Sequence, residues 1–193
     1  MIYTIGHSTR TLDGFVAVLK AHGVTELADI RSMPASRRHP HFNGRALARS
    51  LGACGIVYRH FPGLGGMRSP RRDSSNTAWR GAAFRGYADY MQTAEFARAV
   101  EELLEWAGES AGGVEAGGEA RRVPRVAPCV APCVTMMCAE AAWRECHRQL
   151  TADVLVARGI DVRHITSALA AAPHRLTDFA RVENGSVTYR GLI

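Results

Sequence analysis

The stretch Val134-Thr-Met-Met-Cys-Ala-Glu140, followed by Arg144-Glu-Cys-His-Arg148, decides how the rest of this chain is arranged. Val134 to Met137 is a short apolar run, long enough for a strand that is buried on both faces. The run ends at Cys138-Ala-Glu140, and Cys146-His-Arg148 then opens a helical pattern. Parallel sheets bind ligands at the carboxyl ends of their strands, so we expect the reactive side chains of this stretch to lie in a functional crevice.

Further strands and helices alternate before and after this stretch. The predicted strands cover Ile2 to Ile5, Thr25 to Ile30, Ile56 to Phe61 and Ile160 to Ile165, and helical patterns follow Thr11 and span about 45–53 and 96–104. This spacing favours right-handed crossovers. We therefore predict an α/β fold over residues 1–193: a single three-layer domain with a mostly parallel sheet of about five strands, Rossmann-like or flavodoxin-like. A flexible insertion is expected near 108–127 and a loosely ordered tail from about 166.

Size and composition exclude several classes of protein. A chain of 193 residues with 47% hydrophobic content is large enough to bury a core without disulfides or metal. The amino terminus enters a predicted strand at once and lacks the shape of a signal peptide, and no apolar run approaches the roughly 20 residues of a membrane helix. Five cysteines, an odd number, do not suit a secreted disulfide framework. These features predict a cytoplasmic protein with no membrane partner.

The net charge of +6 is unevenly distributed. Between Arg31 and Arg85 there are eleven arginines and one acidic residue, Asp73. Such a segment favours phosphate-bearing partners, either a small molecule or a nucleic acid. Alternatively, because Lys20 is the only lysine in the chain, some arginines could be solvated residues that reflect codon bias.

Polar residues far apart in the sequence are expected to face one crevice, because strand ends converge in a parallel sheet. Together they supply acid/base groups, thiols and guanidinium groups, which are the components of a polar active site. The catalytic candidates are His7, Asp29, Cys138, Glu140, Cys146 and His147. The ligand-binding candidates are Ser8 and Arg31 at the strand ends and Arg148, which is expected with Cys146 and His147 on the rim of the crevice.

Each candidate also has a structural interpretation. His7 could cap the turn after the first strand, and Asp29 and Arg31 could form a structural ion pair. Free cysteine is among the most buried residue types, so Cys138 and Cys146 could simply pack inward.

Metal and nucleotide cofactors are not predicted. Cys138, Cys146 and His147 have the spacing C-x7-C-H, which lacks the paired clips of ordinary structural zinc sites. The glycines of Pro62-Gly-Leu-Gly-Gly66 match neither a P-loop nor a dinucleotide-binding pattern. Cys129 lies in a small repeat and is left out of the site.

Five motifs in order resemble the family named domain of unknown function 488. They are Thr4-Ile-Gly-His-Ser8, Asp29-Ile-Arg-Ser-Met-Pro-Ala-Ser36, Tyr58-Arg-His-Phe-Pro-Gly-Leu-Gly-Gly66, Phe84-Arg-Gly-Tyr-Ala-Asp-Tyr-Met91, and Cys138-Ala-Glu140 with Cys146-His-Arg148. The resemblance covers residues 1 to about 165 and implies a small bacterial or archaeal α/β protein with no settled activity. Ser36, Tyr58 and Tyr87 lie inside these motifs and are also ligand-binding candidates. The ring of Tyr87 could stack on a base or a sugar, or it could fill the core under the long loop. The sequence departs from the family at Ala142-Trp143, where an Asp-Pro-like helix start is expected, so a weaker helix cap is predicted.

The leading functional hypothesis is an enzyme, a hydrolase or a transferase, that acts on a phosphate-bearing or nucleoside-like ligand. The ligand would lie between Arg31, Arg148 and the helix amino terminus, with His7 and Glu140 as acid/base groups. Cys138 or Cys146 would act as a thiol nucleophile or shape the site. The alternatives are a nucleic-acid-binding accessory module that uses the arginine-rich 31–85 face, and a metal-stabilised structural protein.

Overall fold

A six-stranded sheet forms the centre of the computed structural model, which describes residues 1–108 and 132–191. The strand order is β3-β2-β4-β1-β5-β6, and all neighbours are parallel except β6, which runs antiparallel to β5. The strands are β1 (Ile2–Gly6), β2 (Glu26–Asp29), β3 (Val57–His60), β4 (Val134–Cys138), β5 (Val162–Ser167) and β6 (Ala170–Pro173). The mostly parallel α/β sheet predicted from the sequence is confirmed.

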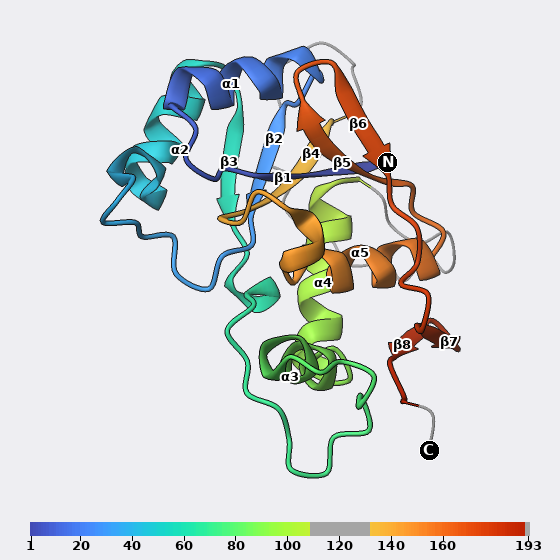
Figure 1. Ribbon diagram of the computed structural model, residues 1–193. Helices are drawn as coiled ribbons and strands as arrows, with labels where there is room; N and C mark the ends of the chain where they lie inside the picture. Colours follow the sequence, from blue (N-terminus) through green and yellow to red (C-terminus); the bar gives the residue numbers. More distant parts are fainter. Residues whose placement is uncertain (109–131, 192–193) are drawn as a thin grey trace, which may run out of the picture.

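Helices cover both faces of this sheet, which gives three layers (Figure 1). On one face lie α1 (Leu12–Ala21) and α2 (Gly44–Ala53), and on the other lie α4 (Ala94–Trp106) and α5 (Arg148–Ala157), with α3 (Ala82–Tyr90) beyond them. Thr11 caps the first helix, since its side chain accepts a hydrogen bond from the Gly14 amide. No helix in the described residues is long and apolar enough to cross a membrane.

The position of β4 between β2 and β1 distinguishes this sheet from the Rossmann order 3-2-1-4-5-6 and the flavodoxin order 2-1-3-4-5. The chain leaves β1 and β2 toward α1 and α2, whereas it leaves β4 toward α5 on the opposite face. The carboxyl end of β4 is therefore flanked by two strands whose connections leave on the other side. Open α/β sheets bind ligands at such a reversal.

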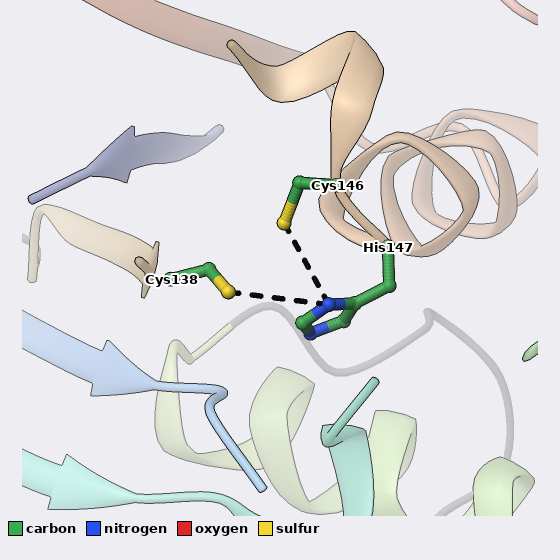
Figure 2. A group of neighbouring side chains, drawn as sticks. All are labelled: Cys138, Cys146 and His147. Carbon is green, nitrogen blue, oxygen red and sulfur yellow. Dashed lines mark hydrogen bonds between the residues drawn. The ribbon is translucent and has the colours of Figure 1, made fainter. Parts of the chain in front are cut away.

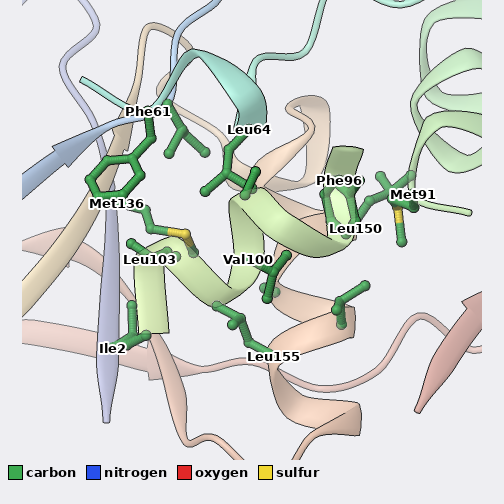
Figure 3. Packing of buried hydrophobic residues seen from close by; sticks show 14 of the residues in the cluster. Ile2, Phe61, Leu64, Met91, Phe96, Val100, Leu103, Met136, Leu150 and Leu155 are labelled. Carbon is green, nitrogen blue, oxygen red and sulfur yellow. The ribbon is translucent and has the colours of Figure 1, made fainter. Parts of the chain in front are cut away.

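Two apolar clusters hold the layers together. One joins the sheet to α1 and α2 and includes Phe15 and Leu47. The other joins it to α4 and α5, where Val100 and Leu103 of α4 meet Met136 of β4 (Figure 3). All five residues of β4 are buried, as expected for a strand covered on both faces.

The segment after residue 166 carries weak order signals in the sequence, yet the structure gives it three strands. After β6 comes a hairpin of β7 (Arg181–Glu183) and β8 (Ser186–Thr188). Its turn is Asn184-Gly185, with φ of 50° and 74°, which suits a type I′ turn. Asn-Gly between short β-prone runs is a signal that could have predicted this hairpin. The insertion expected near 108–127 lies, beyond Gly108, outside the described residues, and so does Cys129.

Buried hydrogen bonds fix this segment to the rest of the fold. The carboxylate of Asp153 in α5 accepts from His174 Nε2 (2.9 Å), Thr177 N (2.9 Å), Thr177 Oγ1 (2.7 Å) and the Tyr189 hydroxyl (2.7 Å). His174 Nδ1 in turn lies 2.9 Å from His164 Nε2 in β5. The tail is thus ordered by contacts with residues distant in the sequence, which local propensity does not report.

Candidate active site

A cavity of about 440 Å³ opens at the carboxyl ends of β1, β2 and β4, beside the start of α5. Seven of the residues predicted from the sequence line it: His7, Arg31, Ser36, Cys138, Glu140, Cys146 and His147. They come together because three parallel strands end at this edge and the chain turns back from β4 into α5. The remaining five, Ser8, Asp29, Tyr58, Tyr87 and Arg148, are not among the lining residues.

His147 faces both sulfur atoms (Figure 2), and all three residues line the cavity. Its Nδ1 lies 3.6 Å from Cys146 Sγ and 4.0 Å from Cys138 Sγ. Its Nε2 lies 3.1 Å from the carbonyl oxygen of Ile30, which can only accept a hydrogen bond, so Nε2 carries the proton. In the neutral ring the lone pair of Nδ1 is therefore directed at the two sulfurs.

The two thiols differ in their acidity. The pKa of Cys146 is lowered well below its ordinary value, first by its interaction with the neighbouring Cys138 thiol and then by His147 and Arg148. The pKa of Cys138 is raised, first by the neighbouring Cys146 sulfur and then by burial.

Arg148 supports this arrangement from inside the protein. Its Nε donates to Cys146 Sγ at 3.4 Å, and its Nη2 donates to the carbonyl oxygen of Glu140. Only 1% of Arg148 is exposed, so its guanidinium group is buried beneath the cavity lining and supports the site rather than contacting a ligand directly. Glu140 itself is exposed, and its Oε2 lies 3.6 Å from Cys138 Sγ. Gly6 is required here because a Cβ atom would lie 1.8 Å from the Glu140 carbonyl oxygen.

A buried ion pair forms the β2 side of the cavity. Asp29 accepts from Arg31 Nε (2.9 Å) and Nη2 (2.6 Å), and from the Tyr58 hydroxyl (2.8 Å). The structural interpretation of this pair therefore fits the geometry: Asp29 is fully buried and orients Arg31, which lines the cavity. The pKa of Tyr58 is raised by burial and then by the charge of Asp29, so its hydroxyl stays a donor.

His7 is held as a neutral acceptor. Its Nδ1 donates to the carbonyl oxygen of Ser8 at 2.9 Å, which leaves Nε2 to accept from Arg31 Nη1 at 3.3 Å. The ring also stacks on Phe42 with centroids 4.2 Å apart. Burial, followed by the charge of Arg31, lowers the pKa of His7 to about 4, which is too low for an efficient general base near pH 7.

The remaining candidates have supporting positions. Ser8 adopts a φ of 52° and turns its carbonyl oxygen toward His7. Tyr87 is fully buried, donates to the Leu64 carbonyl oxygen at 2.9 Å, and lies with its ring 5.0 Å from that of His147.

The helix that follows the cysteines starts as the sequence indicated. α5 begins at Arg148, and His147 at its N-cap makes no side-chain capping hydrogen bond. Ala142, where the weak cap was expected, instead precedes a short 3-10 helix at Trp143–Glu145, which lies before α5, and also makes no side-chain capping hydrogen bond.

Comparison with known protein families identifies the family to which this chain is related. The family model described as Domain of unknown function DUF488 matches residues 11–114, more than half of the sequence. This chain belongs to the DUF488 family. No curated protein and no solved structure matches it significantly. The DUF488 match includes Asp29, Arg31 and Tyr58, whereas His7 and the segment from Cys138 to Arg148 lie outside it, so it covers less of the chain than the resemblance from residue 1 to about 165.

Several lining residues were not among the site candidates. Ser32, Met33, Met67, Phe84 and Glu145 all face the cavity. Most of them lie in the DUF488 motifs quoted above, and this was the signal in the sequence that could have identified them. It was not sufficient, because the directions of their side chains depend on the conformation of the loops.

Gly66 has a specific role beside the catalytic candidates. A Cβ atom at this position would lie 2.3 Å from His147 Nδ1, so only glycine allows the loop to lie against the imidazole. The glycine-rich motif thus shapes the site without binding phosphate in a known loop pattern.

Proposed function

We propose that this protein is an enzyme, a hydrolase or a transferase, that acts on a small phosphate-bearing or nucleoside-like ligand in the cavity. The observation that carries the proposal is that Cys138, Glu140, Cys146 and His147 all line one cavity of about 440 Å³. Two thiols with shifted pKa values beside a histidine and a carboxylate in a concave site are typical of an active site. A purely structural role for both thiols would not require an open cavity beside them.

The lining divides into a polar and an apolar part. Arg31 uses Nη1 for His7 and retains a second N–H on that nitrogen, and Ser32 Oγ and Ser36 Oγ each accept a backbone N–H, which leaves their hydroxyl protons to donate. These donors suit an anionic group. Met33, Met67 and Phe84 supply apolar surface for a base or another flat group.

Glu140 is the acid/base group that the geometry supports best. It is exposed to the cavity and lies next to a sulfur of the reactive group. His7 is held neutral by its surroundings, so we assign it the role of positioning Arg31 instead.

The test is turnover of a panel of p-nitrophenyl phosphate esters, nucleosides and nucleoside monophosphates, together with thermal-shift binding. Glu140→Gln is expected to lower kcat/KM about 100-fold or more, because general acid/base groups contribute on that scale. Glu105→Gln, an exposed acid on α4 outside the cavity, is the matched control. Equal turnover by both variants, or no turnover and no binding across the panel, would contradict the proposal.

A nucleic-acid-binding module is the second candidate, since Arg37, Arg38, Arg72 and Arg80 are exposed and make no ion pair among the described residues. The 31–85 segment does not form one surface, however. α2 lies on one side of the sheet, whereas the loop before α3 lies on the other (Figure 1). Binding to single- or double-stranded oligonucleotides that weakens steeply with salt and survives Glu140→Gln would favour this candidate.

A further inference from the structure

We propose that Cys138, Cys146 and His147 bind a Zn²⁺ ion whose fourth coordination position faces the cavity. Cys138 Sγ, Cys146 Sγ and His147 Nδ1 all lie within 4.8 Å of one another. A tetrahedral zinc with Zn–S of about 2.3 Å and Zn–N of about 2.0 Å sets its sulfur and nitrogen ligands about 3.5 Å apart. The measured separations from Nδ1, 3.6 Å and 4.0 Å, need only a small closure (Figure 2).

The surroundings of the three ligands have the form of a metal site. Metal-binding histidines usually donate their second ring N–H to a carbonyl or carboxylate, which fixes the tautomer. His147 does so toward the Ile30 carbonyl oxygen at 3.1 Å. The Cys146 sulfur accepts from Arg148 Nε at 3.4 Å, and hydrogen bonds of this kind orient a ligating thiolate.

The placement of Nδ1 distinguishes a shared ion from a catalytic thiol–histidine pair. A histidine that activates one thiol needs a single hydrogen bond to that thiol. Here one lone pair faces two sulfurs on different elements, Cys138 at the end of β4 and Cys146 before α5. A metal ion satisfies all three atoms at once.

The ligand set selects the metal. Two thiolates and one imidazole are soft to borderline ligands that favour zinc over magnesium or calcium. The two thiolate charges neutralise Zn²⁺, so the bound ion would add no net charge to a largely buried place, where Cys138 is 5% and Cys146 4% exposed.

The spacing C-x7-C-H lacks paired clips, and this absence argues against a structural site rather than against zinc. Structural sites close with four protein ligands, whereas catalytic sites hold zinc with three and leave one position to water. Cys138, Cys146 and His147 all line the cavity, so the fourth position is open to a ligand. Glu140, 3.6 Å from Cys138 Sγ, is placed to accept a proton from the bound water.

The catalytic use of the ion rests on the proposed function, but its binding does not. We would therefore titrate the reduced full-length protein with Co²⁺ in the absence of any substrate. The expected result is one Co²⁺ per chain, with the visible bands of a tetrahedral site and a thiolate charge-transfer band, both removed by Zn²⁺.

Substitutions of the three proposed ligands test whether the ion binds at this site. Cys138→Ser, Cys146→Ser and His147→Gln are each expected to weaken Co²⁺ binding at least 10-fold, and Glu140→Gln is expected to leave the spectrum in place. Cys54→Ser, a free cysteine that follows α2 and does not line this cavity, is the matched control. Circular dichroism of each variant separates lost binding from lost folding, and His147→Gln retains both thiols if a serine variant does not fold.

Three results would overturn the inference. They are no Co²⁺ binding by the reduced wild type, binding that all three ligand variants retain, and a spectrum without a thiolate charge-transfer band. Failure of the titration together with Glu140-dependent turnover would reject the metal site and leave the enzyme proposal standing.

Discussion

Gly66 is the residue on which the position of His147 depends most directly. In Gly66→Ala the new Cβ would lie 2.3 Å from Nδ1, so the imidazole or the loop must shift. We expect Co²⁺ binding to weaken at least 10-fold while the circular dichroism spectrum keeps its shape, since an orienting contact commonly changes metal affinity on this scale. Gly52→Ala, where a Cβ meets nothing within 4 Å, is the control. Equal affinity of Gly66→Ala and Gly52→Ala for Co²⁺ would mean that the loop around residue 66 can move without displacing His147.

His7 gives the folded state a defined pH dependence. Its pKa is lowered from 6.5 to about 4, first by burial, so between these values the unfolded chain binds a proton that the folded chain does not. The contribution of His7 to the free energy of unfolding is therefore fully present above about pH 6.5. It falls as the pH drops toward 4, by up to about 1.4 kcal/mol per pH unit.

Urea unfolding of wild type and His7→Gln at several pH values tests this dependence. The variant is expected to be less stable near pH 7, because it loses stacking on Phe42, but its stability should change less toward pH 4. His164, whose pKa burial lowers to about 3, contributes to both proteins and cancels in the difference. If the stabilities of wild type and His7→Gln changed equally with pH, the result would contradict the lowered pKa of His7.

At the residue scale the sequence predicted proximity better than it predicted orientation. Polar residues at strand ends were expected in one crevice, and parallel strands bring His7, Arg31 and Cys138 to one cavity. The partners of Arg148 could not be predicted, because the direction of a buried guanidinium depends on which carbonyl oxygens the folded loop presents.

At the element scale α5 is the support on which the carboxyl-terminal segment depends. Asp153→Ala would leave four donor groups without their acceptor, from His174, Thr177 and Tyr189. Leaving such groups unpaired in a buried site costs about 3 kcal/mol or more. Urea unfolding should show this loss, and limited proteolysis should cleave the segment after residue 173 faster.

The matched control for that variant is Asp161→Ala. Asp161 forms a surface ion pair with Arg163 and is about half exposed, so its removal is expected to change stability by less than about 0.5 kcal/mol. Similar losses in both variants would mean that the Asp153 hydrogen bonds do not hold the segment.

At the same scale, the elements that local patterns predict can be separated from the features that they do not predict. Helices and strands up to β5 follow apolar periodicity, which is a local signal. The insertion of β4 between β1 and β2 follows from pairing between segments more than a hundred residues apart, such as Gly6 with Cys138, and no local pattern encodes it. The attachment of the tail to the rest of the fold likewise involves the distant residue Asp153, although the Asn184-Gly185 turn within the tail is a local signal.

At the scale of the whole molecule, the proposed metal couples the two ends of the crossover from β4 to α5. Cys138 closes β4, and Cys146 and His147 precede α5, so an ion that holds all three would also hold the sheet against this helix. A ligand that binds only the folded state stabilises it by about 2.7 kcal/mol at 100 times its dissociation constant. For a chain of this size we expect Zn²⁺ to raise the Tm by roughly 5–10 °C.

Thermal unfolding of the zinc-loaded protein, with and without a chelator, measures this coupling. Wild type and Cys54→Ser should lose the increment when the chelator is added, because both retain the three ligands. Cys138→Ser should lose a clearly smaller increment, because its weakened ligand set binds less of the ion at the same zinc concentration. A Tm that the chelator does not change in wild type, or changes equally in Cys138→Ser, would show that the strand end and the helix start are joined by packing alone.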